Sequence, residues 1–225
     1  MKNAFTGFIL CQVLEDEGFA VERGVGGIET AFIGTFGSGK PVIAILGEFD
    51  ALSGLSQKRG ATFYEPVIPN GNGHGCGHNL LGTAPLAAVV ALKQYMEEHN
   101  MEGTIRYYGC PGEEGGSGKT YMARAGLFDD ADAALTWHPE SFSGIFSLTT
   151  LANYQVYYKF KGVASHAANS PHLGRSALDA VELMNVGANY LREHILPDAR
   201  LHYSVINAGG ISPNVVQREA EVLYL

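Results

Sequence analysis

Cysteines and basic residues are scarce in this sequence, and both shortages restrict what the protein can be. Cys11, Cys76 and Cys110 are odd in number and widely spaced among 225 residues, which does not suit a disulfide framework. Free thiols fit a reducing compartment, so we expect a cytoplasmic protein. Lysine and arginine total 15 against 23 aspartates and glutamates, a net charge of −8. This charge repels a phosphate backbone, and we therefore expect no nucleic-acid partner.

Long apolar segments are also missing. No segment reaches the ~18 to 20 continuous apolar residues of a membrane span. The apolar stretch 5–11 is short, runs into acidic residues at 15–17 and lacks a small-residue cleavage site, so it does not predict a signal peptide. With 46% hydrophobic and 17% charged residues, the composition indicates a globular protein with no membrane association.

Glycine, in contrast, is abundant at 29 residues, which indicates many loops with positive φ angles or close backbone approaches. Hydrophobic periodicity and turn residues divide the first two thirds of the chain into alternating elements. The predicted helices span 5–18, 84–98 and 119–125, and the predicted strands span 30–36, 41–46, 104–110 and 133–137. Alternating strands and helices predict an α/β layer fold.

A different pattern follows residue 150. Polar and apolar residues alternate there, as in an antiparallel strand with one face in solvent, and a helix and two more strands come next. These elements span 154–160, 177–194, 201–206 and 220–225. We therefore predict two domains, 1–150 and 151–225, of which the second is a β-α-β-β unit. Ser176 and Asp179, three residues apart at the helix start, fit a capping box without a catalytic role.

The first chemical candidate is a glycine-rich run at 71–79, which places Cys76 and His78 two residues apart. Its four glycines have no side chains whose packing could order the segment. A thiolate and an imidazole at this spacing can bind one side of a metal ion. The alternative is a flexible turn that carries a cysteine and a histidine by chance.

Two adjacent acids, Glu113 and Glu114, form the second candidate, just after the predicted strand 104–110. One carboxylate can ligate a metal while the other reaches a water molecule as a general base. The alternative is a solvated acidic loop. The nearby sequence 118–120, Gly-Lys-Thr, matches the end of a phosphate loop, but Glu113 stands where that motif needs a glycine, so we reject nucleotide binding.

Two more polar residues follow predicted strands. His138 comes directly after 133–137, and Asp50 follows the strand at 41–46. Side chains at such strand ends meet at one rim of an α/β sheet. His138 can join a ligand set, and Asp50 can orient a ligand histidine. The alternatives are a structural histidine and an ordinary acid at a strand end.

Five ordered motifs extend over nearly the whole chain. They are GEFDAL at 47–52, GHGCGHNLLG at 73–82, GCPGEEGGSGK at 109–119, LTWHP at 135–139 and SHAANSPHLGRSA at 165–177. Together they resemble the metal-dependent amidohydrolases of the aminoacylase and carboxypeptidase type. The resemblance implies a zinc-exopeptidase-like fold, with a mixed-sheet catalytic α/β domain and an inserted α+β, ferredoxin-like lid that also forms a dimer interface.

The resemblance further implies one or two divalent ions, Mn²⁺ or Zn²⁺, and hydrolysis of the amide bond in an N-acyl amino acid such as an aromatic acyl-glutamate. It implies metal ligation by Cys76, His78, Glu114 and His138, proton transfer by Glu113 and support of the site by Asp50. In the lid, it implies that His166 helps to bind the tetrahedral intermediate, and that Arg175 and Asn214 hold the substrate carboxylate. The expected assembly is a homodimer or a heterodimer with a related subunit.

Two features depart from the family pattern. Asn79 stands where many relatives have an aspartate. The chain also stops at Leu225, before the family's catalytic domain resumes and supplies a further metal-binding histidine. We therefore expect both domains to be truncated and these residues alone to be inactive.

Three functions stay open on the sequence. The first is a metallo-amidohydrolase, acting on an aromatic acyl-glutamate or, as a dipeptidase or aminoacylase, on another N-acyl amino acid. The second is a thiol hydrolase in which Cys76 is the nucleophile, paired with His74 or His78 and needing no metal. The third is a non-catalytic metal-binding or partner subunit.

Overall fold

The structure, a computed structural model, describes residues 4–145, 147 and 149–225. The chain forms two compact units, one up to Ser143 and one from Gly144 onward. Within the described residues, no helix has both the length and the apolar character that crossing a membrane requires.

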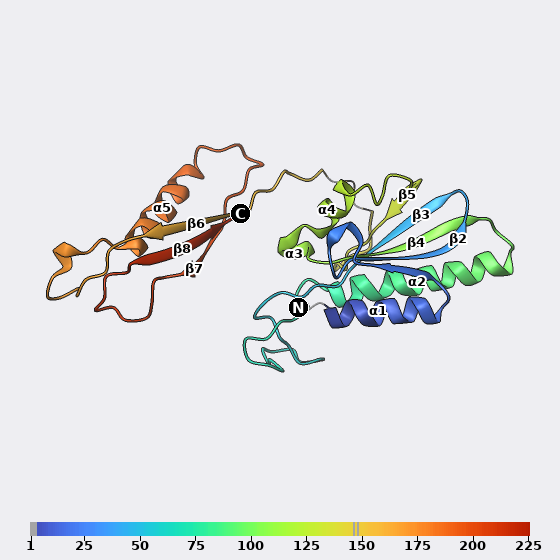
Figure 1. Ribbon diagram of the computed structural model, residues 1–225, viewed down its shortest axis with the longest axis horizontal. Helices are drawn as coiled ribbons and strands as arrows, with labels where there is room; N and C mark the ends of the chain where they lie inside the picture. Colours follow the sequence, from blue (N-terminus) through green and yellow to red (C-terminus); the bar gives the residue numbers. More distant parts are fainter. Residues whose placement is uncertain (1–3, 146, 148) are drawn as a thin grey trace. The chain divides into compact units, whose positions relative to one another are not determined.

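The first unit is built on a mixed five-stranded sheet in the order β1-β2-β4-β3-β5 (Figure 1). Its strands are β1 (Ala20–Arg23), β2 (Phe32–Ser38), β3 (Val42–Glu48), β4 (Gly103–Cys110) and β5 (Ala133–Leu135). The pairs β1/β2 and β2/β4 are antiparallel, whereas β3 runs parallel to both β4 and β5. The register places Glu48 opposite Cys110, so β3 and β4 end side by side. The mixed sheet confirms the expected α/β architecture.

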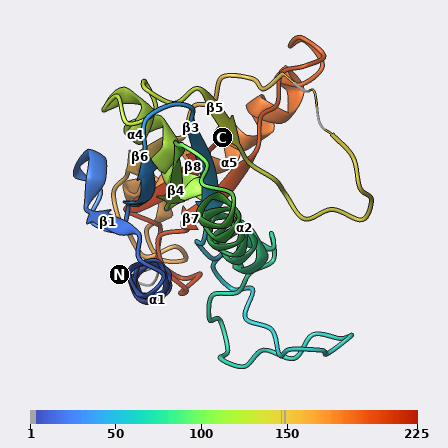
Figure 2. The same cartoon turned by 90° about the vertical axis from the view of Figure 1, so that its right-hand side faces the viewer.

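Helices cover both faces of this sheet. They are α1 (Ala4–Asp16), α2 (His78–Glu98), α3 (Glu113–Gly116) and α4 (Gly118–Arg124), with a 3-10 turn at Val25–Gly27. The helices α1 and α2 lie side by side on one face (Figures 1 and 2), where Leu14 and Val89 are buried with Tyr107. On the other face, Met122 of α4 packs with Tyr108. Since neighbouring residues of β4 point to opposite faces, the two tyrosines anchor two separate cores.

One difference from the sequence prediction is the start of α2, which begins at His78 and not at residue 84. Gly82 and Pro85, both inside the helix, obscured its first two turns because both residue types lower helix propensity. Gly82 has a packing reason, since an added Cβ would lie 2.8 Å from the backbone oxygen of Glu48. Another difference is β1, a strand that was not predicted. The helix α3, which contains the paired glutamates, was also not predicted.

The second unit contains a three-stranded antiparallel sheet in the order β6-β8-β7. Its elements are β6 (Val156–Lys161), a 3-10 turn (Pro171–Leu173), α5 (Ala177–Leu191), β7 (Tyr203–Asn207) and β8 (Glu219–Tyr224). Val181 of α5 packs against Val222 of β8 in the core of this unit. The hydroxyl oxygen of Ser176 accepts the N–H of Asp179 at 3.1 Å, which confirms the predicted helix cap. The predicted β-α-β-β order is also confirmed.

Candidate metal centre

Four segments that are far apart in the sequence meet at one edge of the five-stranded sheet. Because β3, β4 and β5 run parallel, the residues that follow them emerge at the same edge. Asp50 follows β3, and Glu113 and Glu114 follow β4 at the start of α3. His138 follows β5, and α2 begins there with His78. The candidates of the first unit therefore lie together.

His78 lies at the centre of this cluster with only 1% of its surface exposed. Its Nδ1 lies 3.1 Å from Oδ1 of Asp50, so the N–H sits on Nδ1 and is donated to the carboxylate. The other ring nitrogen, Nε2, is buried and has no hydrogen-bond partner among the described residues. It lies 3.8 Å from a carboxylate oxygen of Glu113 and 3.8 Å from one of Glu114. An unpartnered lone pair among carboxylates is what a cation site requires.

Cys76 and His138 extend the cluster. The Sγ of Cys76 lies 3.3 Å from Nε2 of His138, while Nδ1 of His138 lies 3.0 Å from the carbonyl oxygen of Pro139 and donates its proton there. Both histidines thus use Nδ1 for an oxygen acceptor and turn Nε2 toward the cluster, which is the usual arrangement of metal-ligating histidines. Ligand atoms of Cys76, His78 and His138 all lie within 4.8 Å of one another.

The electrostatics of Cys76 argue against a thiolate nucleophile. Burial raises the pKa of its thiol to about 11, and the carboxylate of Glu114, followed by those of Glu113 and Glu48, acts in the same direction. Reactive cysteines instead have a lowered pKa, from nearby positive charge. A cation bound beside the thiol would offset these negative charges and favour the thiolate, which is the form that ligates a metal. The surroundings therefore suit a metal ligand.

The carboxyl of Glu113 is also perturbed. Burial raises its pKa above the ordinary value of 4.5, and the negative charge of Glu48 acts in the same direction. Its side chain is 42% exposed, whereas that of Glu114 is 24% exposed. The two neighbouring acids therefore differ in access to solvent, as a division between a base and a ligand would require.

Backbone geometry fixes both ligand-bearing helices. Asp50 uses its second carboxylate oxygen, Oδ2, to accept the N–H of Glu114 at 3.1 Å, which ties the start of α3 to the end of β3. Gly77 and Gly112, directly before His78 and Glu113, have φ angles of 79° and 66°. Such left-handed turns favour glycine, so these positions direct each helix start back toward the sheet edge.

Two residues of this cluster, Glu48 and Lys119, were not predicted from the sequence. Glu48 is buried at the end of β3, and its Oε2 lies 3.3 Å from Nε2 of His78. The ammonium group of Lys119 contacts Oε1 of the same carboxylate. The available signal was an acid that ends an apolar strand two residues before Asp50. In the sequence, Lys119 stands out only as part of the rejected phosphate loop.

The remaining candidates lie in the second unit. Nδ1 of His166 accepts the backbone N–H groups of Ala168 and Asn169 at 3.2 and 3.1 Å. A neutral ring with two donors at Nδ1 carries its proton on Nε2, so His166 can donate a hydrogen bond from that atom. The backbone oxygen of Asn214 accepts the N–H of Ala167 at 2.9 Å, which brings His166 and Asn214 together.

Arg175 lies on a different stretch of the second unit. Its backbone pairs with that of Val163 in an isolated bridge, and its Nη1 donates to the carbonyl oxygen of Gly174 at 2.7 Å. The substrate-binding roles of Arg175 and Asn214 and the catalytic role of His166 stay predictions.

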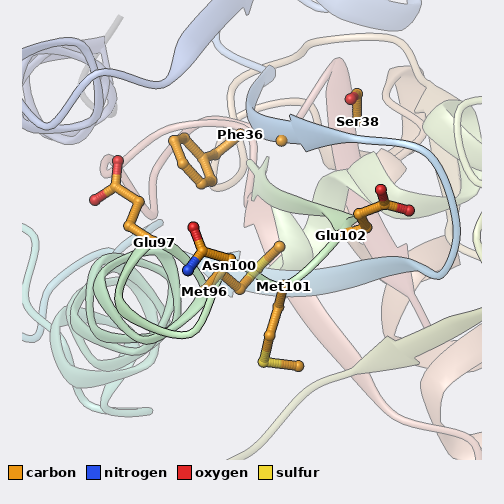
Figure 3. A pocket seen from close by; sticks show the side chains of 9 residues that line it. Phe36, Ser38, Met96, Glu97, Asn100, Met101 and Glu102 are labelled. Atoms are coloured by element: carbon orange, nitrogen blue, oxygen red, sulfur yellow. The ribbon is translucent and has the colours of Figure 1, made fainter.

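A separate hollow of about 420 Å³ lies where β2 ends and β4 begins, at the opposite edge of the sheet. Phe36 and Met96 line it, and Figure 3 shows Glu97 and Glu102 on opposite sides of the view. Its two carboxylates do not converge, and among the described residues neither a histidine nor a cysteine lines it. This hollow therefore lacks the ligand chemistry of the cluster around His78.

The residues of the cluster fit a divalent metal. Imidazole nitrogens, a thiolate and carboxylates are the ligands of Zn²⁺, and carboxylates also suit Mn²⁺. A second group, formed by Glu48, His78 and Glu113, offers three ligand atoms within 4.8 Å of one another. The two groups share His78, whose unpartnered Nε2 is the strongest single indication of a metal.

Comparison with known proteins agrees with this geometry. The profile of peptidase family M20/M25/M40 matches residues 44–211. One of the subunits of p-aminobenzoyl-glutamate hydrolase from Escherichia coli (strain K12) is 64% identical over 216 residues, which cover 96% of this chain and 45% of that protein. The chain thus spans about half the length of this relative.

Solved structures show the same fold at lower identity. A putative aminohydrolase from methicillin resistant Staphylococcus aureus matches with a TM-score of 0.60 and 21% identity, covering 98% of this chain and 60% of that one. A dinuclear metal binding peptidase of the M20 family from Bacillus subtilis matches with a TM-score of 0.55 and 19% identity, covering 99% of this chain and 58% of that one.

Proposed function

Because the chain belongs to peptidase family M20/M25/M40, we propose that it provides the metal centre of an amidohydrolase that cleaves N-acyl amino acids. The substrate we propose is p-aminobenzoyl-glutamate, which gives p-aminobenzoate and glutamate. The observation that carries the proposal is the buried, unpartnered Nε2 of His78. The choice of substrate is supported by the 64% identity to the E. coli protein that bears this hydrolase name.

Four residues would hold the metal, one or two ions of Zn²⁺ or Mn²⁺. They are Cys76, His78 and His138, whose ligand atoms lie within 4.8 Å of one another, and Glu114, whose carboxylate lies 3.8 Å from Nε2 of His78. Asp50 orients His78 through the bond at Nδ1. When bound, such an ion polarises an amide carbonyl and lowers the pKa of water. The thiol of Cys76 favours Zn²⁺, and the carboxylates also accept Mn²⁺.

Glu113 would act as the general base. Its carboxylate takes a proton from the attacking water and later gives it to the nitrogen of the leaving amine, so the amide ends as an acid and an amine. Its greater solvent exposure and its raised pKa support this role, because a better proton acceptor is needed near neutral pH.

The second unit would act as a ferredoxin-like lid and dimerisation domain. We propose that Nε2–H of His166 donates to the oxygen of the amide as negative charge develops there, and that Arg175 and Asn214 hold the substrate carboxylate. The hydrogen bonds at Nδ1 of His166 support a donor at Nε2. The partner would be a second copy or a related chain, which is supported by the description of the E. coli relative as one subunit of its hydrolase.

Two further points belong to the proposal. The described cysteines are free thiols, and a cysteine ligand has to stay reduced, so we propose a cytoplasmic location. The E. coli relative is more than twice as long as the match, and we propose that hydrolysis requires the residues that a longer protein adds. The metal-free thiol hydrolase is disfavoured by the raised pKa of Cys76.

The test is a substrate comparison with the purified full-length protein. We expect release of p-aminobenzoate from p-aminobenzoyl-glutamate, loss of that release after chelation, and its return with Zn²⁺ or Mn²⁺. Other N-acyl amino acids serve as controls for the acyl group. A metal-loaded protein that hydrolyses none of these amides would contradict the proposal and favour a non-catalytic role.

A further inference from the structure

Glu48 belongs to the metal centre by position but has no role in the function proposed above. It is the last residue of β3, and its side chain is only 10% exposed. Oε1 of the carboxylate contacts the ammonium group of Lys119, and Oε2 lies 3.3 Å from Nε2 of His78. A charged carboxylate is rarely buried unless it is paired or binds a metal, so each oxygen requires an explanation.

The ion pair with Lys119 accounts for the burial of only one of the two carboxylate oxygens of Glu48. The N–H of His78 is donated to Asp50 from Nδ1, so Nε2 presents a lone pair toward Oε2 of Glu48. In a neutral ring with its proton on Nδ1, both atoms are hydrogen-bond acceptors at 3.3 Å, and their interaction is repulsive. No described residue donates a hydrogen bond to Nε2. A cation bound between Oε2 and Nε2 would remove this repulsion and give each of the two atoms a partner.

We propose that Glu48 is a further ligand of the metal centre, binding through Oε2 together with Nε2 of His78. This inference rests on the proposed metal-dependent function. Lys119 then balances the charge of the carboxylate at Oε1 and leaves Oε2 facing His78. Ligating carboxylates are commonly held in this way by a second hydrogen bond.

The spacing of the ligand atoms fits this assignment. Atoms of Glu48, His78 and Glu113 lie within 4.8 Å of one another, and ligands that are each about 2.1 Å from one ion are separated by about 3 to 4 Å. With Glu48 as the ligand on this side of His78, Glu113 is not needed for binding. Glu113 stays free to move a proton.

The competing explanation is a buried ion pair without metal ligation. In that case Glu48 serves only as the partner of Lys119, and the 3.3 Å approach to His78 is incidental. Two substitutions separate the explanations. Glu48→Gln removes the anionic ligand and keeps the volume, whereas Lys119→Met removes the ion pair and keeps the ligand.

The experiment compares wild type, Glu48→Gln and Lys119→Met in the full-length protein. Metal content is measured after dialysis against Zn²⁺, affinity is measured by Co²⁺ titration, and thermal unfolding is followed with and without Zn²⁺. We expect Glu48→Gln to bind Co²⁺ at least about tenfold more weakly and to retain less Zn²⁺. Zn²⁺ should raise its unfolding temperature less than that of wild type.

Lys119→Met leaves Glu48 buried and unpaired in the metal-free protein, so that form should unfold at a lower temperature than wild type. Zn²⁺ should then stabilise this variant at least as much as wild type, because the ion replaces the missing positive charge. An equal Zn²⁺-induced shift in all three proteins would identify a plain ion pair and overturn the inference.

A further variant keeps the test decisive if Glu48→Gln does not fold. Glu48→Asp retains the charge but draws the carboxylate back by one methylene, and we expect weaker Co²⁺ binding. Wild-type affinity in Glu48→Asp, or wild-type Zn²⁺ content in Glu48→Gln, overturns the ligand role while leaving the proposed hydrolase intact. A wild-type protein that binds no metal overturns both.

Discussion

Oδ1 of Asp50 lies 3.1 Å from Nδ1 of His78, and the two residues are only 5% and 1% exposed. This contact decides which ring nitrogen carries the proton and directs the lone pair of Nε2 into the acidic cluster. Because Oδ2 of Asp50 also accepts the N–H of Glu114, one carboxylate aligns a histidine and a helix start. Asp50 thus organises the centre without facing the metal side itself.

Replacement of Asp50 by asparagine should therefore weaken metal binding. The amide keeps the shape of the side chain, but it cannot provide two anionic oxygens for Nδ1–H and for the N–H of Glu114. We expect a loss of roughly 10- to 100-fold in Co²⁺ affinity, measured by titration. Asp129→Asn, at an exposed acid in another part of the unit, is the matched control. Equal Co²⁺ affinities in the two variants would contradict this role of Asp50.

The paired glutamates should give opposite phenotypes. Glu113→Gln keeps metal but loses on the order of 10²- to 10⁴-fold in turnover, because an amide cannot take a proton from water. Glu114→Ala should instead lower the metal content. Metal analysis and p-aminobenzoyl-glutamate turnover, measured on both full-length variants, test the division. Similar metal content in both variants, or near wild-type turnover in Glu113→Gln, would contradict it.

Gly77→Ala should damage both the fold and the centre. The residue has a φ of 79°, and an added Cβ would lie 2.5 Å from Cγ of Pro139, next to His138. Gly39→Ala is a matched control, because Gly39 has a φ of 82° and no atom within 4 Å of an added Cβ.

Both alanine variants should lose about 1 to 2 kcal/mol of unfolding free energy from the left-handed backbone, measured by urea denaturation. Only Gly77→Ala should also lose Co²⁺ affinity, because only there does the new methyl group press on the segment that carries His138. A comparable loss of affinity in Gly39→Ala would show that the effect is general destabilisation.

Asp132 lies at the end of the sheet opposite the candidate metal centre. It should make the stability of the protein depend on pH. Oδ1 is bonded to the ammonium of Lys40 at 2.8 Å and Oδ2 accepts the N–H of Val42 at 2.7 Å. The hydrogen bond from Lys40, followed by that from Val42, holds the pKa of this carboxyl below its ordinary value of 3.8.

A lowered pKa in the folded state means that the stabilisation is present above pH 3.8 and is lost as the pH falls below it. Asp132→Asn should therefore unfold at a lower urea concentration than wild type at pH 7, and the two midpoints should converge as the pH falls below 3.8. A gap that stays constant from neutral pH to well below 3.8 would contradict this linkage.

Much of the fold was predictable because its strands are strongly apolar and bounded by turns. The strand prediction at 104–110 agrees with β4, whose Tyr107 and Tyr108 fill opposite cores. The predicted helix at 84–98 was shorter than α2 because Gly82 and Pro85 resemble turn residues. The close approach of Gly82 to the backbone of Glu48 is a tertiary contact that local periodicity does not reveal.

The candidate centre was predictable where residues stand in motifs or at strand ends. Cys76, His78, Glu114 and His138 were named from spacing, order and family resemblance, and the structure brings them to one edge of the sheet. Glu48 was missed because an isolated acid at a strand end carries no spacing signal. Its significance depends on the register that puts β3 beside β4 and on the direction of one imidazole ring.

Metal content and turnover measured on the same samples test most directly whether the cluster around His78 is a catalytic metal centre. The full-length protein is stripped of metal, returned to increasing amounts of Zn²⁺ or Mn²⁺, and assayed on p-aminobenzoyl-glutamate at each step. We predict no turnover in the stripped protein and a rise in turnover that follows bound metal until the centre is filled. Full turnover in protein from which the metal has been removed would contradict it.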